Sequence, residues 1–135
     1  MTRIVSLSML ALLLGSSLSV AADPFAGKWV NTDEKTDSIT RLQIKAEGDS
    51  WVIQAWGKCH PTDCDWGKAP LHVLGDSPGD KEMKYGLAHW DHKFADAYIT
   101  LHFEKGELVP ETYEVYKDKS GRSNFRHKES FKKGK

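Results

Sequence analysis

Apolar and polar residues alternate with a period of two along much of the chain. The alternation covers residues 39–46, 51–56, 97–104 and 112–116, and it is typical of β-strands with one buried face. Turn-forming residues separate these stretches, in the segments EGDS (47–50), GDSPGD (75–80), EKGE (104–107) and DKSGR (118–122). Gly, Asp and Ser favour tight turns. We expect helix only as a single turn near residues 91–95.

The pattern predicts about eight short strands joined by hairpin connections. A chain of this kind favours an all-β fold, a small antiparallel up-and-down barrel, with a β-sandwich as the alternative. A closed barrel also leaves no open sheet edge, which suits an exported chain rich in aromatic residues.

The first 22 residues have the character of a secretory signal peptide. Arg3 provides a positive start, residues 4–14 are mostly apolar, and Val20, Ala21 and Ala22 suit a signal peptidase. The apolar run is too short to span a bilayer comfortably. We therefore expect cleavage after Ala22, no stable membrane insertion, and a single domain over residues 23–135 in the periplasm or outside the cell.

Charge is unevenly distributed. Residues 23–116 carry 10 Lys/Arg and 17 Asp/Glu, a net charge of −7, whereas residues 117–135 carry 8 Lys/Arg and 2 Asp/Glu, a net charge of +6. We interpret the basic tail, about residues 129–135, as a solvated and fraying end rather than an arm for anionic partners. An acidic main body does not indicate a nucleic-acid partner.

The most distinctive segment is WGKCHPTDCDWG, residues 56–67. Two cysteines in an exported chain predict a Cys59–Cys64 disulfide. Closing a six-residue loop contributes only about 2 kcal/mol by chain entropy, so the bond mainly fixes local geometry. The alternative is a metal site of Cys59, His60, Asp63 and Cys64 completed by His89, His92 or His102. The Cys-x4-Cys spacing is not a common zinc spacing, and we expect neither a metal nor another cofactor.

A hairpin of residues 51–59 and 64–74 follows if Cys59 lies opposite Cys64. The loop is then residues 60–63, Trp66 faces Gly57, and Trp56 faces Gly67. Trp66 shares the core face with the cysteines, and the opposite face carries Trp56. In the second strand, Trp66 is at an even position, but the next apolar residues, Ala69, Leu71 and Val73, are at odd positions. One extra residue would place them all on the same face, which predicts a β-bulge near Gly67 and Lys68.

A candidate binding surface lies on the outer side of this hairpin. It consists of Trp56, Lys58, His60 and Asp65. An exposed indole beside polar groups is a platform for sugars and peptides. The barrel mouth is the rival site, for a small apolar ligand. The partner stays open between a small molecule, a glycan and a protein, and the oligomeric state is open as well.

Catalytic chemistry has weaker support. His89 and Asp91 share a strand face and could orient a general base, with His102 as a further histidine, but no nucleophile accompanies them. Asp33, Glu34 and Asp37 depart from calcium-loop spacing. The sequence favours a non-enzymatic binding or interaction module. The alternatives are a protease-inhibitor-like barrel that inserts a terminus at Asp23, and a small hydrolase that uses His89 and Asp91.

The segment AGKWVNT, residues 26–32, resembles the Gly-x-Trp entry motif of the calycin barrels, the lipocalins and avidins. This resemblance implies that Trp29 closes one barrel end, with Arg122 or Arg126 packed across it. GKWVN is also similar to the start of the avidins, where Asn31 would match a ligand-contacting Asn. The avidin Ser loop is not recognisable in TDEKTDS, so the resemblance implies a fold and not biotin binding.

Residues 27–67 also resemble small exported bacterial domains with the pattern W-G-x-C-x-P-T-D-C-D-W-G. That group has no established activity. The resemblance implies a shared disulfide-stapled β-domain and no particular chemistry.

Overall fold

A computed structural model describes residues 24–135, and the predicted signal peptide lies outside the described residues. The described part has no helix and contains nine strands: β1 (Gly27–Asn31), β2 (Ile39–Glu47), β3 (Ser50–Gly57), β4 (Cys64–Leu74), β5 (Tyr85–Asp91), β6 (Ala95–Glu104), β7 (Glu107–Tyr116), β8 (Phe125–Lys128) and β9 (Phe131–Lys133).

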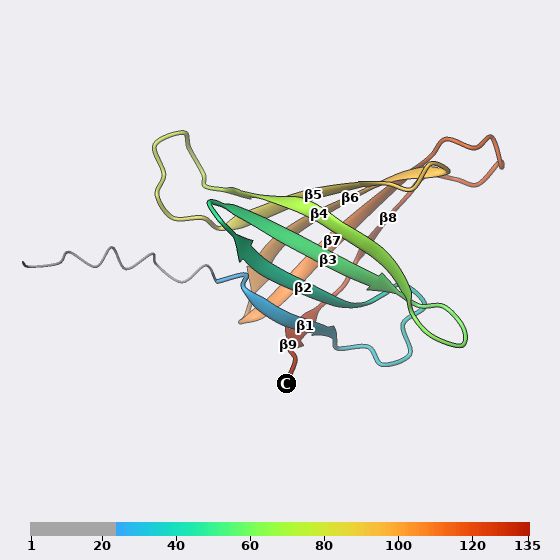
Figure 1. The fold of residues 1–135 in the computed structure, drawn as a ribbon, viewed down its shortest axis with the longest axis horizontal. Coiled ribbons are helices and arrows are strands. Elements are labelled where there is room, and N and C mark those ends of the chain that lie inside the picture. The colour runs from blue at the N-terminus through green and yellow to red at the C-terminus, as the bar shows by residue number, and fades with distance from the viewer. Residues whose placement is uncertain (1–23) are drawn as a thin grey trace, which may run out of the picture.

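The strands form a closed antiparallel barrel (Figure 1). Neighbours along the chain pair from β1 to β7, and β9 closes the ring by pairing with both β1 and β7. These eight strands make the barrel, and β8 is an additional strand on β7. The predicted barrel is confirmed, and the sandwich alternative is excluded.

The basic C-terminal residues are part of this barrel, so their interpretation as a fraying tail is wrong. Phe131 is fully buried, and it pairs with Asn31 of β1 and with Leu108 of β7. The Gly134 amide donates to the Lys28 carbonyl at 2.9 Å. A three-residue strand is too short to show alternation, which is why the sequence pattern did not reveal it.

One end of the barrel is filled by large side chains. The core cluster there includes Phe25, Trp29, Leu42, Ile44, Ile53, Leu71, Leu101, Leu108 and Phe131. Trp29 donates its indole N–H to the Phe25 carbonyl at 2.8 Å. The cation over the Trp29 ring is Lys133, with Nζ 4.5 Å from the ring centroid. Arg126 instead pairs with Glu111 on the outer surface, which corrects the expected Trp29–Arg126 packing.

The other end of the barrel is split into two walls (Figure 1). Strands β4 and β5 pair only from His72 to Leu74, so they separate on the far side of Pro70, which has no N–H to donate. On the opposite side, β8 pairs with β7 but not with β1. Strands β1–β4 therefore form one wall of this end, and β5–β8 form the other.

The connection between β5 and β6 is a tight turn rather than the expected helical turn. The His92 amide donates to the Ala95 carbonyl at 2.9 Å, and the Lys93 amide donates to Asp91 Oδ1 at 2.8 Å. Lys93 has a positive φ of 68°, which ends any helical path. No helix within residues 24–135 is long and apolar enough to cross a membrane.

The β3–β4 hairpin contains the predicted bulge, but its register differs by two residues. Gly57 lies opposite Cys64, Trp56 opposite Asp65, and Ala55 opposite Gly67, which makes Trp66 the extra residue. Gly67 takes a φ of 80°, a conformation that glycine adopts without steric cost. The register differs because the Lys58 amide leaves the hairpin and donates to the Ser38 carbonyl at 2.8 Å. A shift of two keeps Ile53, Ala55 and Trp66 on their predicted core face.

Candidate functional site

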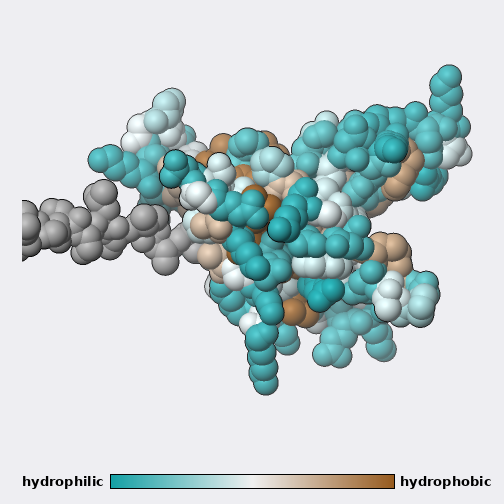
Figure 2. All heavy atoms as spheres, viewed as in Figure 1, coloured by the Kyte–Doolittle hydropathy of each residue, from teal (hydrophilic) through white to brown (hydrophobic). Residues whose placement is uncertain are grey.

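A cleft of about 610 Å³ opens between the two walls at the disulfide end of the barrel. Figure 2 shows the surface hollowed on the right, between an upper and a lower lobe. The lower wall contributes Asp37, Ser38, Gly57, Lys58, Cys59, Cys64, Asp65 and Trp66, and the upper wall contributes His92, Phe94, Glu114, Phe125 and His127. This volume is in the range of small-molecule sites.

The lower wall is built around the Cys59–Cys64 disulfide, which is present as predicted. The Thr40 hydroxyl donates to Asp63 Oδ2 at 2.7 Å, which ties the loop between the cysteines to β2. The contact from Lys58 to Ser38 ties the start of the same loop to the β1–β2 connection. The disulfide loop is therefore fixed against β2 and forms a rigid lip of the cleft.

Trp66 packs between this wall and the core. Its indole covers Gly57 so closely that a Cβ there would lie 2.8 Å from the Trp66 Nε1 atom. The ring makes edge-to-face contacts with Trp90 at 5.8 Å and with His92 at 4.8 Å between centroids. Trp90 spans the open seam by donating its indole N–H to the Gly67 carbonyl at 3.0 Å. The predicted contact of Trp66 with Gly57 is thus present in the folded chain.

His92 lies on the upper wall between Trp66 and Phe94. Its ring stacks on Phe94 with centroids 5.8 Å apart. Its Nε2 atom is buried and has no hydrogen-bond partner within the described residues. Burial lowers the pKa of His92 below its ordinary value, and the carboxylate of Glu114 opposes this shift. His92 therefore faces the cleft as a neutral aromatic ring at neutral pH.

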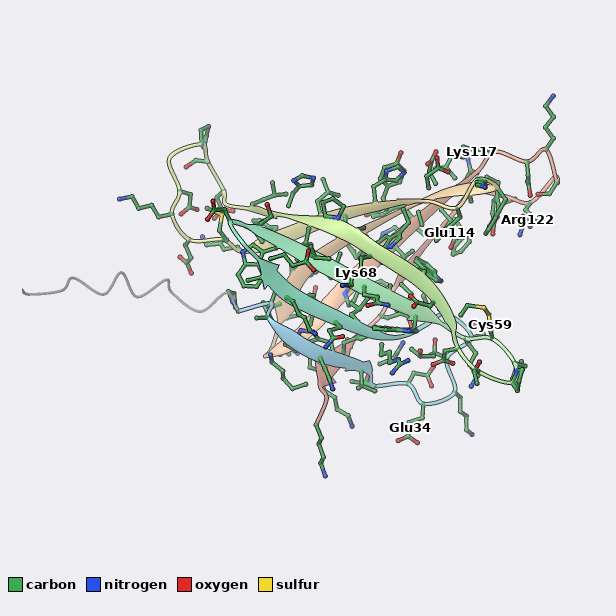
Figure 3. All side chains as sticks on the ribbon, in the orientation of Figure 1. Glu34, Cys59, Lys68, Glu114, Lys117 and Arg122 are labelled. Carbon is green, nitrogen blue, oxygen red and sulfur yellow. A yellow bond between two sulfur atoms is a disulfide. The ribbon has the colours of Figure 1, made fainter. Side chains whose placement is uncertain are left out.

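Glu114 provides a carboxylate on the upper wall. Figure 3 labels Glu114 above the cleft and Cys59 below it. Glu114 lies opposite Phe125 in the β7–β8 pair and is half-buried. Burial first, and the Glu114 carboxylate second, raise the pKa of the neighbouring Tyr116. Among residues 24–135, no lysine or arginine forms an ion pair with Glu114.

Glu129 closes the seam beside the cleft, a role that the sequence pattern did not indicate. Its carboxylate accepts hydrogen bonds from the Asn31 amide and from the Thr36 hydroxyl, the latter at 3.0 Å. Asn31 also donates to the Ile39 carbonyl at 2.8 Å and is buried. The Asn31 side chain therefore joins β1 to β2 and to Glu129.

The four residues of the predicted binding surface divide between two places. Lys58 and Asp65 line the cleft. Trp56 lies on the outer side under Arg41, whose guanidinium carbon is 4.2 Å from the ring centroid. A hydrogen bond from the Gln54 side chain, and a weaker effect of one from the Gly67 amide, lower the pKa of Asp65. His60 is exposed at the loop tip and does not line the cleft.

The histidines considered for catalysis lie on the outer face of the barrel. His89 contacts Asp96 at 2.8 Å, whereas Asp91 accepts from Lys117 at 2.9 Å. His102 contacts Glu104 at 3.0 Å. His89 and Asp91 therefore do not form the expected pair, and neither lines the cleft.

The metal alternatives lack the necessary geometry in the described residues. No group of three or more His, Cys, Asp or Glu side chains in residues 24–135 is arranged to hold a metal ion. Cys59 and Cys64 are bonded to each other. Asp33, from the calcium alternative, accepts the Lys35 amide at 3.0 Å and so stabilises its own turn.

Comparisons of the chain with protein-family models, with curated proteins and with solved structures find no match. Function is therefore inferred from the geometry of the cleft.

Proposed function

We propose that the protein is an exported, non-enzymatic binding module that holds a small ligand in the cleft at the disulfide end. The observation that carries the proposal is the cleft itself: a concave site of about 610 Å³ with aromatic walls and a few polar groups. Small-molecule sites combine an apolar surface with a few fixed polar contacts. The tether between the disulfide loop and β2 holds one wall in place, which lowers the entropic cost of binding.

Export is part of the same proposal. A small disulfide-bonded barrel is typical of proteins outside the reducing cytosol. Expression of the full chain in an exporting bacterial host should yield a product that begins near Asp23. Its intact mass should show the loss of residues 1–22 and of both thiol hydrogens. Cytosolic, uncleaved protein with reduced cysteines would argue against export.

The binding proposal is tested with N-phenyl-1-naphthylamine, a neutral apolar fluorescent probe. The probe should gain fluorescence on the native protein and shift the NMR signals of Trp66 and His92. Replacing Phe125 by Ala should weaken binding several-fold, because Phe125 lines the cleft and is 44% exposed.

Tyr98→Ala is the matched control, since Tyr98 is 39% exposed on β6 and does not line the cleft. It should leave probe binding unchanged. Equal losses in the two variants, or NMR shifts confined to the outer face, would contradict the proposed site.

A further inference from the structure

The cleft joins an aromatic wall to a net negative charge. At neutral pH its formal charges are the carboxylates of Asp37, Asp65 and Glu114 and the ammonium of Lys58, which sum to −2 when histidines are counted as neutral. Burial keeps His92 neutral and so removes one possible positive charge from the wall. The lining is therefore complementary to a cation.

Glu114 differs from the carboxylates on the outer face of the same wall. Asp91 and Asp96 both pair with Lys117, and Glu111 pairs with Arg126. Glu114, on the cleft side, has no such partner among the described residues. A half-buried carboxylate beside aromatic rings is less hydrated than a surface carboxylate, which strengthens its attraction for a cation.

The aromatic rim already accommodates one cation. The Arg122 guanidinium carbon lies 4.1 Å from the Tyr116 ring centroid and 5.4 Å from that of Phe94. Asp118 holds Arg122 in place through an ion pair of 2.7 Å. Hydrogen bonds from Ser120, and to a smaller extent from Arg122, lower the pKa of Asp118 to about 2. Arg122 itself does not line the cleft. Trp66 and Phe125 both line the cleft.

We infer that the ligand of this cleft is a small organic cation, an amine or quaternary ammonium group carried on an apolar body. The cationic group lies against Glu114 and the faces of Phe125 and Trp66. Cation–π contact and ion pairing both favour this placement. The inference rests on the proposed function, because it names the ligand class of the proposed cleft.

Three ligands with a common benzyl body and different charges test the inference. They are benzyltrimethylammonium, benzyl alcohol and phenylacetate, each titrated into the native protein and followed by displacement of N-phenyl-1-naphthylamine and by NMR. Benzyltrimethylammonium should bind about tenfold more tightly than benzyl alcohol, and phenylacetate more weakly than either. Raising the salt concentration should reduce the difference in affinity between benzyltrimethylammonium and the other two ligands.

Two variants assign the preference to residues. Glu114→Gln keeps the side-chain shape and should lower the affinity for benzyltrimethylammonium about tenfold while binding of benzyl alcohol is unchanged. Phe125→Leu keeps apolar volume but removes the ring, so it should weaken binding of the cation alone. Glu107→Gln is the matched control, because Glu107 is exposed at the other end of β7 and does not line the cleft.

The outcomes separate the two proposals. If the fluorescent probe binds in the cleft but the three ligands bind equally, or phenylacetate binds best, the cation inference is overturned and the binding module stands. An unchanged preference in Glu114→Gln, with its circular dichroism intact, also overturns it. If neither the probe nor any of the three ligands shifts the signals of cleft residues, the proposed function itself fails.

Discussion

His92 combines a buried ring nitrogen with two aromatic neighbours. The Nε2 atom has no hydrogen-bond partner in the described residues, and a buried polar atom without a partner opposes folding. Protonation would place a charge at the same buried position. His92 therefore makes the native state sensitive to acid.

The sign of this pH dependence follows from the direction of the shift. Burial lowers the pKa of His92 in the folded state, so the unfolded chain binds the proton more strongly. The free energy of unfolding should fall as the pH drops from the ordinary histidine value of about 6.5 towards the lowered folded value. His92→Phe should remove this part of the dependence without loss of stability near pH 7, because it replaces the unpartnered nitrogen by carbon.

Urea denaturation between pH 5 and pH 7 measures this effect. His60→Asn is the control, because His60 is exposed in the disulfide loop, and it should leave the pH profile as in the wild type. A wild-type slope retained in His92→Phe would refute the assignment.

Gly57 determines the position of Trp66. An added Cβ would meet the Trp66 Nε1 atom at 2.8 Å, so Gly57→Ala should displace the indole. We expect a loss of about 1–3 kcal/mol in the free energy of unfolding, as in other over-packed sites. Shifted tryptophan fluorescence and weaker binding of the apolar probe should accompany it. Gly79→Ala is the matched control, since a Cβ at Gly79 has no neighbour within 4 Å, and its fluorescence should match the wild type.

At the scale of elements, the disulfide loop depends on several contacts and not on the disulfide alone. Hydrogen bonds from Thr40 and Lys58 hold the same loop. We therefore expect a Cys59→Ser, Cys64→Ser double variant to remain folded and to lose about 2 kcal/mol of stability, the chain-entropy contribution of a short ring.

Chemical denaturation and probe titration of this double variant give the two readouts. Probe affinity should fall by less than in Phe125→Ala, because the loop loses its disulfide but keeps its hydrogen bonds to Thr40 and Ser38. An unfolded double variant would show instead that the disulfide is needed to establish the fold.

At the scale of the whole molecule, the barrel closes through one short strand. Phe131 is fully buried and contacts strands on both sides. Phe131→Ala should cost about 3–5 kcal/mol, the usual cost of truncating a buried aromatic residue. Phe125→Ala, at a site that is 44% exposed, should cost much less. Guanidinium denaturation compares the two directly, and similar losses would contradict the assigned role of β9.

The alternating pattern was sufficient to predict the strands and the barrel, because alternate side chains along each strand reach the core. Local chemistry also predicted the disulfide, the bulge and the contact of Trp66 with Gly57. The hairpin register was wrong because Lys58 pairs with Ser38, which is distant in sequence. The sequence suggested a ligand site at the barrel mouth but not the cleft between two walls. The cleft forms because β4 and β5 separate beyond Pro70. Pro70 within a strand was the one local signal of that separation.

The split barrel has a consequence for protein engineering. Three connections contribute residues to the cleft: residues 32–38, 58–63 and 92–94. The packed core lies mainly at the opposite end of the same strands. Sequence libraries placed in these three connections would vary the binding surface on an unchanged scaffold, much as antibody loops vary on a constant framework. A chain of this size would then serve as a compact, single-disulfide source of new binders.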